Sequence, residues 1–260
     1  MTLDPTSLIV MFTAVGAVIG SFLNVCIYRV PLGKSIVFPA SACESCRREL
    51  SWYENIPIVS WSVLGAKCRT CKAPLSIQHP IVEAVTAAMF GLAAWQYGLS
   101  WILAAQLVFG CALIVLFAID LEHHLLPNVI TLPGIVVGFV FSLVTGPGWL
   151  DSLIGIVIGG GSLWLIAELY YRLRHEDGLG MGDVKMLAMI GAFIGWKLTL
   201  VTLMMASIAG SVVGLLLVAA RKGDMKYALP FGTFLAMGAA LAATVGTSLL
   251  DWYLSLYPTI

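Results

Sequence analysis

Long apolar stretches alternate with short polar ones along most of this chain. A helix rises 1.5 Å per residue, so about 20 apolar residues cross the ~30 Å hydrocarbon core of a bilayer. The pattern predicts an all-α polytopic membrane protein with about eight transmembrane helices, one of them short. The predicted spans are residues 8–28, 81–98, 101–119, 128–144, 150–171, 184–196, 198–220 and 230–250.

Composition supports this interpretation. Hydrophobic residues make up 60% of the chain and charged residues only 11%, whereas about 25% of the residues in soluble domains are charged. These values exclude a soluble globular protein, and we expect a lipid bilayer, but no nucleic acid, as a partner. The first apolar stretch has no basic flank and no small-residue cleavage site, so it is interpreted as a retained span. The sequence does not indicate an oligomeric state.

Lysine and arginine set the predicted orientation, since short cytoplasmic loops are rich in both. With eight spans, all of the 14 basic residues except Lys197 lie on the side of the segments 29–78, 172–185 and 221–226. That side is predicted to be cytoplasmic, with both termini outside. With seven spans, the basic cluster at 221–226 would face outward, so eight spans are favoured.

The first polar segment, residues 29–79, carries two Cys-x-x-Cys pairs separated by 21 residues. This arrangement is typical of a four-thiolate structural zinc site. The cytoplasm is reducing, so disulfides are not expected, and zinc would supply folding free energy to a loop with little core. A redox pair or unligated thiols are the alternative. The predicted ligands are Cys43, Cys46, Cys68 and Cys71.

Between the cysteine pairs lies an aromatic, proline-bent segment, residues 50–61. It is either an interfacial belt, since tryptophan and tyrosine favour that depth, or a surface for a substrate or cofactor. Two carboxylates, Glu83 and Glu168, fall within predicted spans. We interpret each as either a structural residue or part of a substrate path.

Two aspartates lie at the ends of predicted spans, at similar depth. Asp183 follows Gly180 and Gly182 at the start of the short span, and Asp120 ends another span. An ionisable group within a membrane segment is costly and indicates a functional site by default. The alternatives are an ordinary N-cap for Asp183 and a solvated helix end for Asp120. Glycines beside Asp183 permit close approach by another segment, and Lys185 completes the motif.

Two neighbouring carboxylates cannot both ionise comfortably, so such a pair shares a proton. The ionised member can take a proton from a water that attacks a scissile carbonyl, and the protonated member can donate to the carbonyl oxygen. Helix dipoles favour Asp183 as the base and Asp120 as the acid. The sequence therefore predicts an aspartyl protease built into a membrane.

Five stretches of the sequence resemble the bacterial type IV prepilin leader peptidases, membrane aspartyl proteases of the Gly-x-Gly-Asp type. The resemblance covers nearly the whole chain, although this family often has aspartate in place of Asn128 and proline in place of Thr233. The stretches are residues 20–31 (GSFLNVCIYRVP), the four-cysteine loop with 52–57 (WYENIP), 119–133 (IDLEHHLLPNVITLP), 180–185 (GMGDVK) and 229–234 (LPFGTF).

The resemblance implies that Asp120 and Asp183 are the catalytic pair. It implies cleavage of the basic leader from prepilins and pseudopilins at the cytoplasmic face of the bacterial inner membrane. Members with the cysteine loop usually also methylate the new N-terminal amine with S-adenosylmethionine, so both activities are expected here. Glu54 and Asn55 are the candidate residues for contact with that cofactor.

The predicted organisation has three parts. Residues 1–28 form the first transmembrane helix, residues 29–79 the zinc loop, and residues 80–260 the membrane-embedded peptidase domain. Two alternatives remain: a monofunctional peptidase whose zinc loop is purely structural, and a non-enzymatic, proton-coupled transporter. A transporter would be indicated by an internal repeat with interrupted helices in both halves, and no clear repeat is present in the sequence.

Overall fold

The structure is a computed structural model that describes residues 4–43, 45–176, 180–220 and 229–256. Within these residues the fold is helical, as the sequence predicts, and it also contains two isolated β-bridges. Leu179, in the stretch beside Asp183, and the basic residues Arg221, Lys222 and Lys226 lie outside the described residues. The helices are α1 (Pro5–Arg29), the 3-10 helix η1 (Trp52–Asn55), α2 (Val59–Val63), α3 (Gln78–Tyr97), α4 (Trp101–His123), α5 (Asn128–Ser142), α6 (Trp149–Arg174), α7 (Met181–Ala219) and α8 (Phe231–Ser255).

Five of the described helices are long and apolar enough to cross a membrane: α1, α4, α6, α7 and α8. The remaining predicted spans correspond to α3, to the shorter α5, and to the first part of α7. The helices begin and end within a few residues of the predicted limits because hydropathy changes sharply at each end. The protein is a multi-pass membrane protein.

The chain divides into two compact units, and the first contains residues 1–115. In this unit α1 packs against α3 through glycines that leave no room for a side chain. A Cβ atom on Gly16 would lie 2.7 Å from Cβ of Phe90, and one on Gly20 would lie 2.7 Å from Cα of Glu83. Small residues of this kind let membrane helices approach closely. Near the other end of this pair, Leu8 belongs to a small apolar core.

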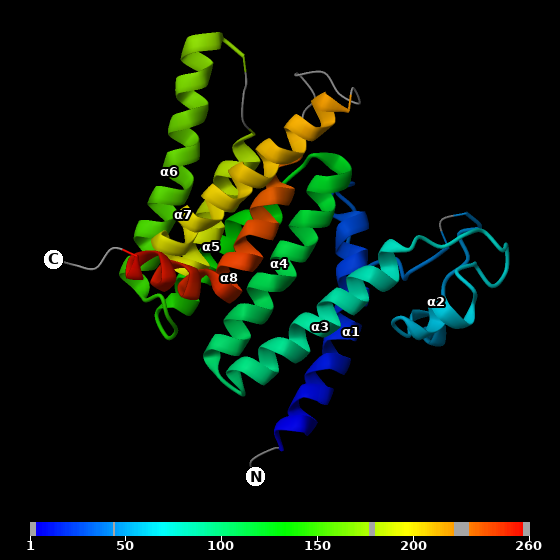
Figure 1. Ribbon diagram of the computed structural model, residues 1–260. Helices are drawn as coiled ribbons and strands as arrows, with labels where there is room; N and C mark the ends of the chain where they lie inside the picture. Colours follow the sequence, from blue (N-terminus) through cyan, green and yellow to red (C-terminus); the bar gives the residue numbers. More distant parts are fainter. Residues whose placement is uncertain (1–3, 44, 177–179, 221–228, 257–260) are drawn as a thin grey trace. The chain divides into compact units, whose positions relative to one another are not determined.

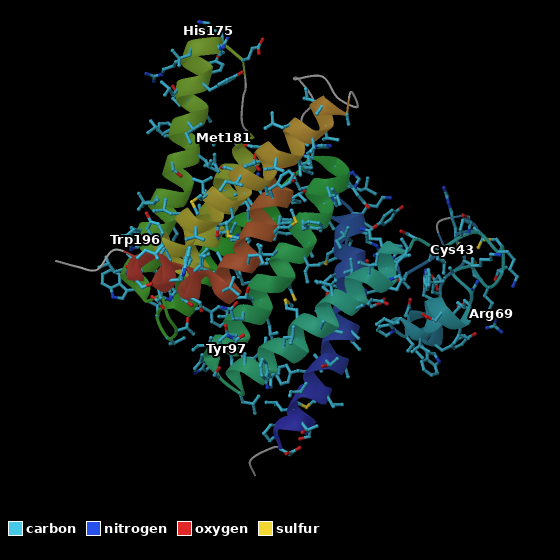
Figure 2. All side chains as sticks on the ribbon, viewed as in Figure 1. Cys43, Arg69, Tyr97, His175, Met181 and Trp196 are labelled. Atoms are coloured by element: carbon cyan, nitrogen blue, oxygen red, sulfur yellow. The ribbon has the colours of Figure 1, made fainter. Side chains whose placement is uncertain are left out.

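The second unit contains residues 116–260 and is built around α7. Helix α7 is interrupted at Gly195, where φ is 74° and ψ is 169°, a conformation that favours glycine. In Figure 2 the first arm of α7 runs from Met181 to the turn at Trp196, and Figure 1 shows the second arm of α7 returning toward the same end. Trp196, labelled in Figure 2, marks the turn and donates to Asp151 of α6 at 3.2 Å. The two arms are the predicted short and long spans, and the break lies close to the predicted boundary at Lys197.

The first arm of α7 packs against α6 with backbone touching backbone. A Cβ atom on Gly155 would lie 2.9 Å from the carbonyl carbon of Gly191, and one on Gly159 would lie 3.0 Å from that of Leu187. Ser152 of α6 also donates to the carbonyl oxygen of Ala192 at 2.8 Å. This contact fixes the arm that carries Asp183.

Candidate active site and metal centre

Asp120 lies in the last turn of α4, and only 4% of its surface is exposed. Its Oδ2 atom accepts two hydrogen bonds from Thr233 in the first turn of α8. The backbone N–H donates at 2.6 Å and the hydroxyl at 3.0 Å. The first four N–H groups of a helix have no partner within the helix. Asp120 therefore satisfies one of these donors and is held by it.

Asp183 lies in the first turn of α7 and is 9% exposed. The alternative interpretation of Asp183 as an ordinary N-cap does not hold, because the N-cap is Gly180, whose extended backbone begins the helix. The N–H of Asp183 donates to the carbonyl oxygen of Gly180 at 3.1 Å. Asp120 and Asp183 are thus two buried carboxylates at the ends of separate helices of the second unit.

Leu126, in the connection between α4 and α5, packs against the glycines on both sides of this pair. A Cβ atom on Gly182 would lie 2.9 Å from Cβ of Leu126, and one on Gly232 would lie 2.8 Å from its Cδ1. The same Cβ on Gly232 would lie 3.0 Å from Cγ and Oδ2 of Asp120. Glycine at both positions lets the starts of α7 and α8 approach the end of α4.

Lys185 links the start of α7 to the start of α5. Its Nζ donates to Oδ1 of Asn128, the first residue of α5, at 2.9 Å. The side chain is thus a cross-link between the helix starts and makes no described ion pair. Since α5 also packs against α7, this bond helps to fix the first turn that carries Asp183.

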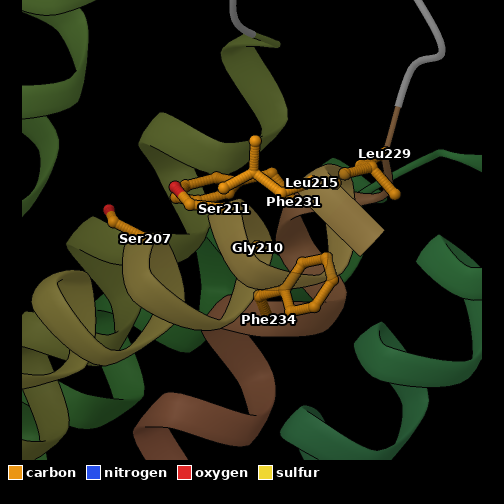
Figure 3. A pocket seen from close by; sticks show the side chains of 8 residues that line it. Ser207, Gly210, Ser211, Leu215, Leu229, Phe231 and Phe234 are labelled. Atoms are coloured by element: carbon orange, nitrogen blue, oxygen red, sulfur yellow. The ribbon is translucent and has the colours of Figure 1, made fainter. Parts of the chain in front are cut away.

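A groove of about 680 Å³ lies beside the start of α8 (Figure 3). Small residues of the second arm of α7 and two phenylalanines of α8 line it. Phe231 and Phe234 line this groove, whereas Thr233, between them in sequence, contacts Asp120 instead. The lining residues are Ser207, Gly210, Ser211, Gly214, Leu215, Leu229, Phe231 and Phe234.

The four predicted metal ligands come together in the first unit. The sulfur atoms of Cys43, Cys46, Cys68 and Cys71 all lie within 4.8 Å of one another, and those of Cys43 and Cys71 are 3.8 Å apart. A tetrahedral zinc site with 2.3 Å Zn–S bonds separates its sulfurs by about 3.8 Å. The donor set therefore fits zinc.

Each cysteine pair is shaped by the same local turn. Arg47, directly after the first pair, and Lys72, directly after the second, both have positive φ, at 57° and 59°. The N–H of Arg47 donates to the carbonyl of Cys43, and that of Lys72 to the carbonyl of Cys68. Backbone N–H groups of Cys71 and Thr70 lower the pKa of the Cys68 thiol to about 6. A thiolate is the form that binds a metal.

Glu54 is held inside the same loop. Its Oε1 accepts from Arg48 at 2.6 Å and its Oε2 from the N–H of Ser51 at 2.8 Å. The Arg48 bond, followed by the Ser51 bond, lowers the pKa of Glu54 to about 2. Both oxygens of this candidate cofactor residue are thus used by the loop, whereas the neighbouring Asn55 is exposed.

Glu83 of α3 is 7% exposed and anchors the loop to the helices. Its Oε2 accepts from the N–H of Ile58 at 2.7 Å. Ile58 has a φ of 62°, a rare conformation for a β-branched residue. Nearby, Asn24 of α1 donates to the carbonyl of His79 at 3.1 Å. Of the two carboxylates within predicted spans, Glu83 holds the backbone of the loop through Ile58, whereas Glu168 pairs with Arg172 on the surface of α6.

Sequence reasoning missed Thr233, Leu126 and Gly232 as parts of the site. The stretch 229–234 was recognised as a family motif, but nothing in its composition indicates that a threonine N–H meets a carboxylate 113 positions earlier. The proline and glycine before Thr233 are a helix-start signal. Because this helix start and Asp120 lie at similar predicted depths in the membrane, the signal could have suggested the contact between Thr233 and Asp120.

These features define a class: a polytopic helical membrane protein with two buried carboxylates at helix ends and a four-cysteine lobe. Two family profiles match the chain. The first, Bacterial Peptidase A24 N-terminal domain, covers residues 14–97, and the second, Type IV leader peptidase family, covers residues 107–215. The chain belongs to the type IV leader peptidase family, which confirms the resemblance noted from the sequence.

Curated relatives match over nearly the full length. The chain is 33% identical to the prepilin leader peptidase/N-methyltransferase of Pseudomonas aeruginosa, covering 96% of this chain and 94% of the relative. It is 34% identical to the protein of the same name from Neisseria gonorrhoeae, covering 92% of each. The corresponding Aeromonas hydrophila protein is 33% identical, over 96% of this chain and 93% of its own. No solved structure matches the chain significantly.

Proposed function

We propose that this protein removes the leader peptide from type IV prepilins and pseudopilins, using Asp120 and Asp183 as an acid–base pair. The observation that carries the proposal is that two buried carboxylates from separate helices converge on the region around Leu126, which packs against Gly182 beside Asp183 and against Gly232 beside the carboxylate of Asp120. Both residues lie within 107–215, the range matched by the Type IV leader peptidase family model. The names of the full-length relatives, which specify prepilin leader peptidases, support the substrate class.

The chemistry follows from a shared proton. The ionised carboxylate takes a proton from a water molecule, whose oxygen attacks the carbonyl carbon of the scissile peptide bond. The protonated carboxyl donates its proton to the carbonyl oxygen, giving a tetrahedral intermediate. The intermediate then collapses: a hydroxyl proton returns to the pair, the leaving amine takes a proton, and the C–N bond breaks. Gly180, Gly182 and Lys185 support the segment on which Asp183 is held.

We assign these roles to parts of the chain as follows. Residues 80–260 form the peptidase domain, residues 29–79 the zinc loop, and residues 1–28 the first membrane helix. Basic residues gather at 29–78, 172–185 and 221–226, so this side, and with it the aspartate pair, faces the cytoplasm and both termini lie outside.

A second activity is methylation of the N-terminal amine that cleavage releases. The relatives are named N-methyltransferases as well as peptidases. Zinc, held by the four cysteines, would fix the fold of the loop, and S-adenosylmethionine would supply the methyl group. Because both oxygens of Glu54 are engaged within the loop, Glu54 acts on the shape of the loop, and the exposed Asn55 is the better candidate for contact with the donor. A monofunctional peptidase is the alternative.

The test uses purified, zinc-loaded protein, a tagged prepilin and isotopically labelled S-adenosylmethionine. Mass spectrometry of the mature N-terminus separates three products: intact leader, cleaved amine, and cleaved and methylated amine. Asp120→Asn and Asp183→Asn are each expected to abolish cleavage, while Asp251→Asn, an exposed carboxylate of α8, cleaves normally. An intact leader with the unaltered protein would refute the peptidase. Cleavage without methylation would favour the monofunctional alternative.

A further inference from the structure

The segment between the two cysteine pairs, residues 52–63, presents large apolar side chains outward. Trp52 of η1 and Val63 of α2 are each 79% exposed. Val59, one helical turn before Val63, is also exposed and lies on the same face of α2. Helix η1 packs against α2, so the two short helices form one substructure. Its outer apolar side chains have little protein to cover them.

The depth of this segment follows from its contact with α3. The N–H of Ile58 donates to Oε2 of Glu83 at 2.7 Å. Glu83 packs against Gly20 of α1, where a Cβ atom would lie 2.7 Å from Cα of Glu83. Gly20 lies nine residues, or about 14 Å, before the end of α1 at Arg29. A glutamate side chain is much shorter than this distance, so Ile58 and the start of α2 lie beside the membrane helices of the first unit rather than beyond Arg29.

The serines of α2 have their hydrogen-bonding groups paired within the segment. The N–H groups of Ser60 and Ser62 donate to the carbonyl oxygens of Ile56 and Ile58. The hydroxyls of the same two serines donate to the same two carbonyls, at 2.7 and 2.9 Å. Paired polar groups can leave water at much lower cost than unpaired ones. The polar residues of α2 are therefore compatible with a position at the edge of the hydrocarbon.

The loop around this segment is basic. Residues 29–79 contain seven lysines and arginines against three acidic residues, and the negative charge of a zinc ion with four thiolates does not reverse this excess. Arg69 lies over the ring of Tyr53 at 5.6 Å and donates to its hydroxyl, and Tyr53 packs edge-on against Trp52. Aromatic residues favour the membrane interface, and lysine and arginine beside it are attracted to an anionic leaflet.

We propose that residues 52–63 form an interfacial anchor, which inserts Trp52, Val59 and Val63 among the lipids of an anionic leaflet while Arg69 contacts lipid phosphates. Of the two interpretations that the sequence left open, the depth of Ile58 favours the interfacial one. The outer apolar side chains of the segment are thus covered by lipid rather than by a substrate or cofactor. Naming the leaflet as the cytoplasmic one rests on the proposed orientation, whereas the depth of the segment does not.

The test attaches a nitroxide spin label at Val63→Cys in the full, zinc-loaded protein, with Cys26 and Cys111 replaced by alanine. The protein is held in nanodiscs of phosphatidylcholine and phosphatidylglycerol. Val18→Cys, exposed in the middle of α1, is the lipid reference, and Glu176→Cys, exposed in the polar segment after α6, is the water reference. Collision rates with oxygen and with a water-soluble nickel complex report the depth. The oxygen-to-nickel ratio at position 63 should exceed that of the water reference severalfold and approach that of the lipid reference.

The anchor is overturned if the nickel complex dominates at position 63 as it does at the water reference. It is also overturned if the label is shielded from both reagents, because protein would then cover it. The measurement uses no prepilin, so it is independent of the peptidase. A lipid-embedded label in a protein that does not cleave prepilin would count against the proposed function and leave the anchor standing.

The contribution of charge is tested with Arg69→Gln, which should shift the label at position 63 toward water. Arg69→Lys keeps the charge and should retain the depth. Lys197→Gln removes the same charge at the one basic residue predicted on the other side of the membrane, and should change nothing. Nanodiscs of phosphatidylcholine alone should shift the label as Arg69→Gln does. An unchanged depth both in these nanodiscs and in Arg69→Gln would overturn the contact with lipid phosphates.

Discussion

Replacing Gly232 by alanine would test whether the position of Asp120 controls the rate. The new methyl group would lie 3.0 Å from both Cγ and Oδ2 of Asp120, whereas ordinary contact begins at 3.4 Å. It would also lie 2.8 Å from Cδ1 of Leu126, but that atom is the flexible end of a side chain and can rotate away. The carboxylate is held by Thr233 of the same helix, so moving it away from a methyl group on residue 232 must lengthen or break these hydrogen bonds.

The required displacement of the carboxylate is thus about 0.4 Å, the difference between 3.0 and 3.4 Å. A misplacement of 1 Å at a reacting group costs about a hundredfold in rate. On a logarithmic scale, 0.4 Å costs roughly sixfold, or about 1 kcal/mol of transition-state stabilisation. Stability should not fall in parallel, because alanine is favoured over glycine in a helix by up to about 1 kcal/mol.

The assay is steady-state cleavage of a prepilin by purified protein, together with thermal unfolding. Gly161→Ala is the control, because a Cβ atom at Gly161 of α6 would meet nothing within 4 Å. It should leave both kcat and the unfolding temperature unchanged or slightly raise the latter. A Gly232→Ala enzyme with kcat within twofold of normal, and with unchanged stability, would refute the link between this contact and the rate.

Three further predictions follow from the contacts. Cys68→Ser should reduce the bound zinc below one ion per chain and abolish methylation, but leave leader cleavage intact. Metal analysis and the mass of the product measure these effects. Equal loss of both activities would contradict separate roles for the zinc loop and the aspartate pair. Glu83→Gln should weaken the hydrogen bond that anchors the N–H of Ile58 and so speed amide hydrogen exchange in residues 51–63. Because a hydrogen bond to a charged group is lost, exchange should be faster on the order of tenfold or more. Unchanged exchange rates would exclude the anchor. Lys185→Met should reduce kcat severalfold by freeing the start of α7. Asn128→Asp should raise the unfolding temperature, because the 2.9 Å contact with Lys185 becomes an ion pair. An unfolding temperature of Asn128→Asp equal to that of the unaltered protein would contradict a cross-linking role for Lys185.

The helices could be predicted because a bilayer imposes a length and a polarity that a single sequence reveals. Helix α5 begins at Asn128 as expected, and the break in α7 falls at Gly195, close to the predicted end of the short span. The four-cysteine cluster could be predicted equally well, since two Cys-x-x-Cys pairs can together coordinate one tetrahedral ion. These features depend on neighbours in the chain.

The rest depends on contacts between distant segments. Hydropathy could place Asp120 and Asp183 at similar depth but could not show that the starts of α7 and α8 both pack against Leu126. Sequence left open the alternative that Asp183 is an N-cap, and only the backbone shows that Gly180 holds that position in an extended conformation. Glu54 looked available to a cofactor, since no sequence pattern reveals that Arg48 and a backbone N–H occupy both of its oxygens.

The close approach of α6 to the first arm of α7 has a mechanical consequence. The two backbones touch near Gly155 and Gly191, and Ser152 ties the turn at Ala192. Sliding this arm would drive backbone atoms into each other, so the structure leaves little travel for the aspartate at its start. We expect the catalytic geometry to exist before a substrate arrives. We then expect substrate selection to occur at entry to the site. It would depend on which polypeptides can bring a peptide bond to two aspartates that are already in place.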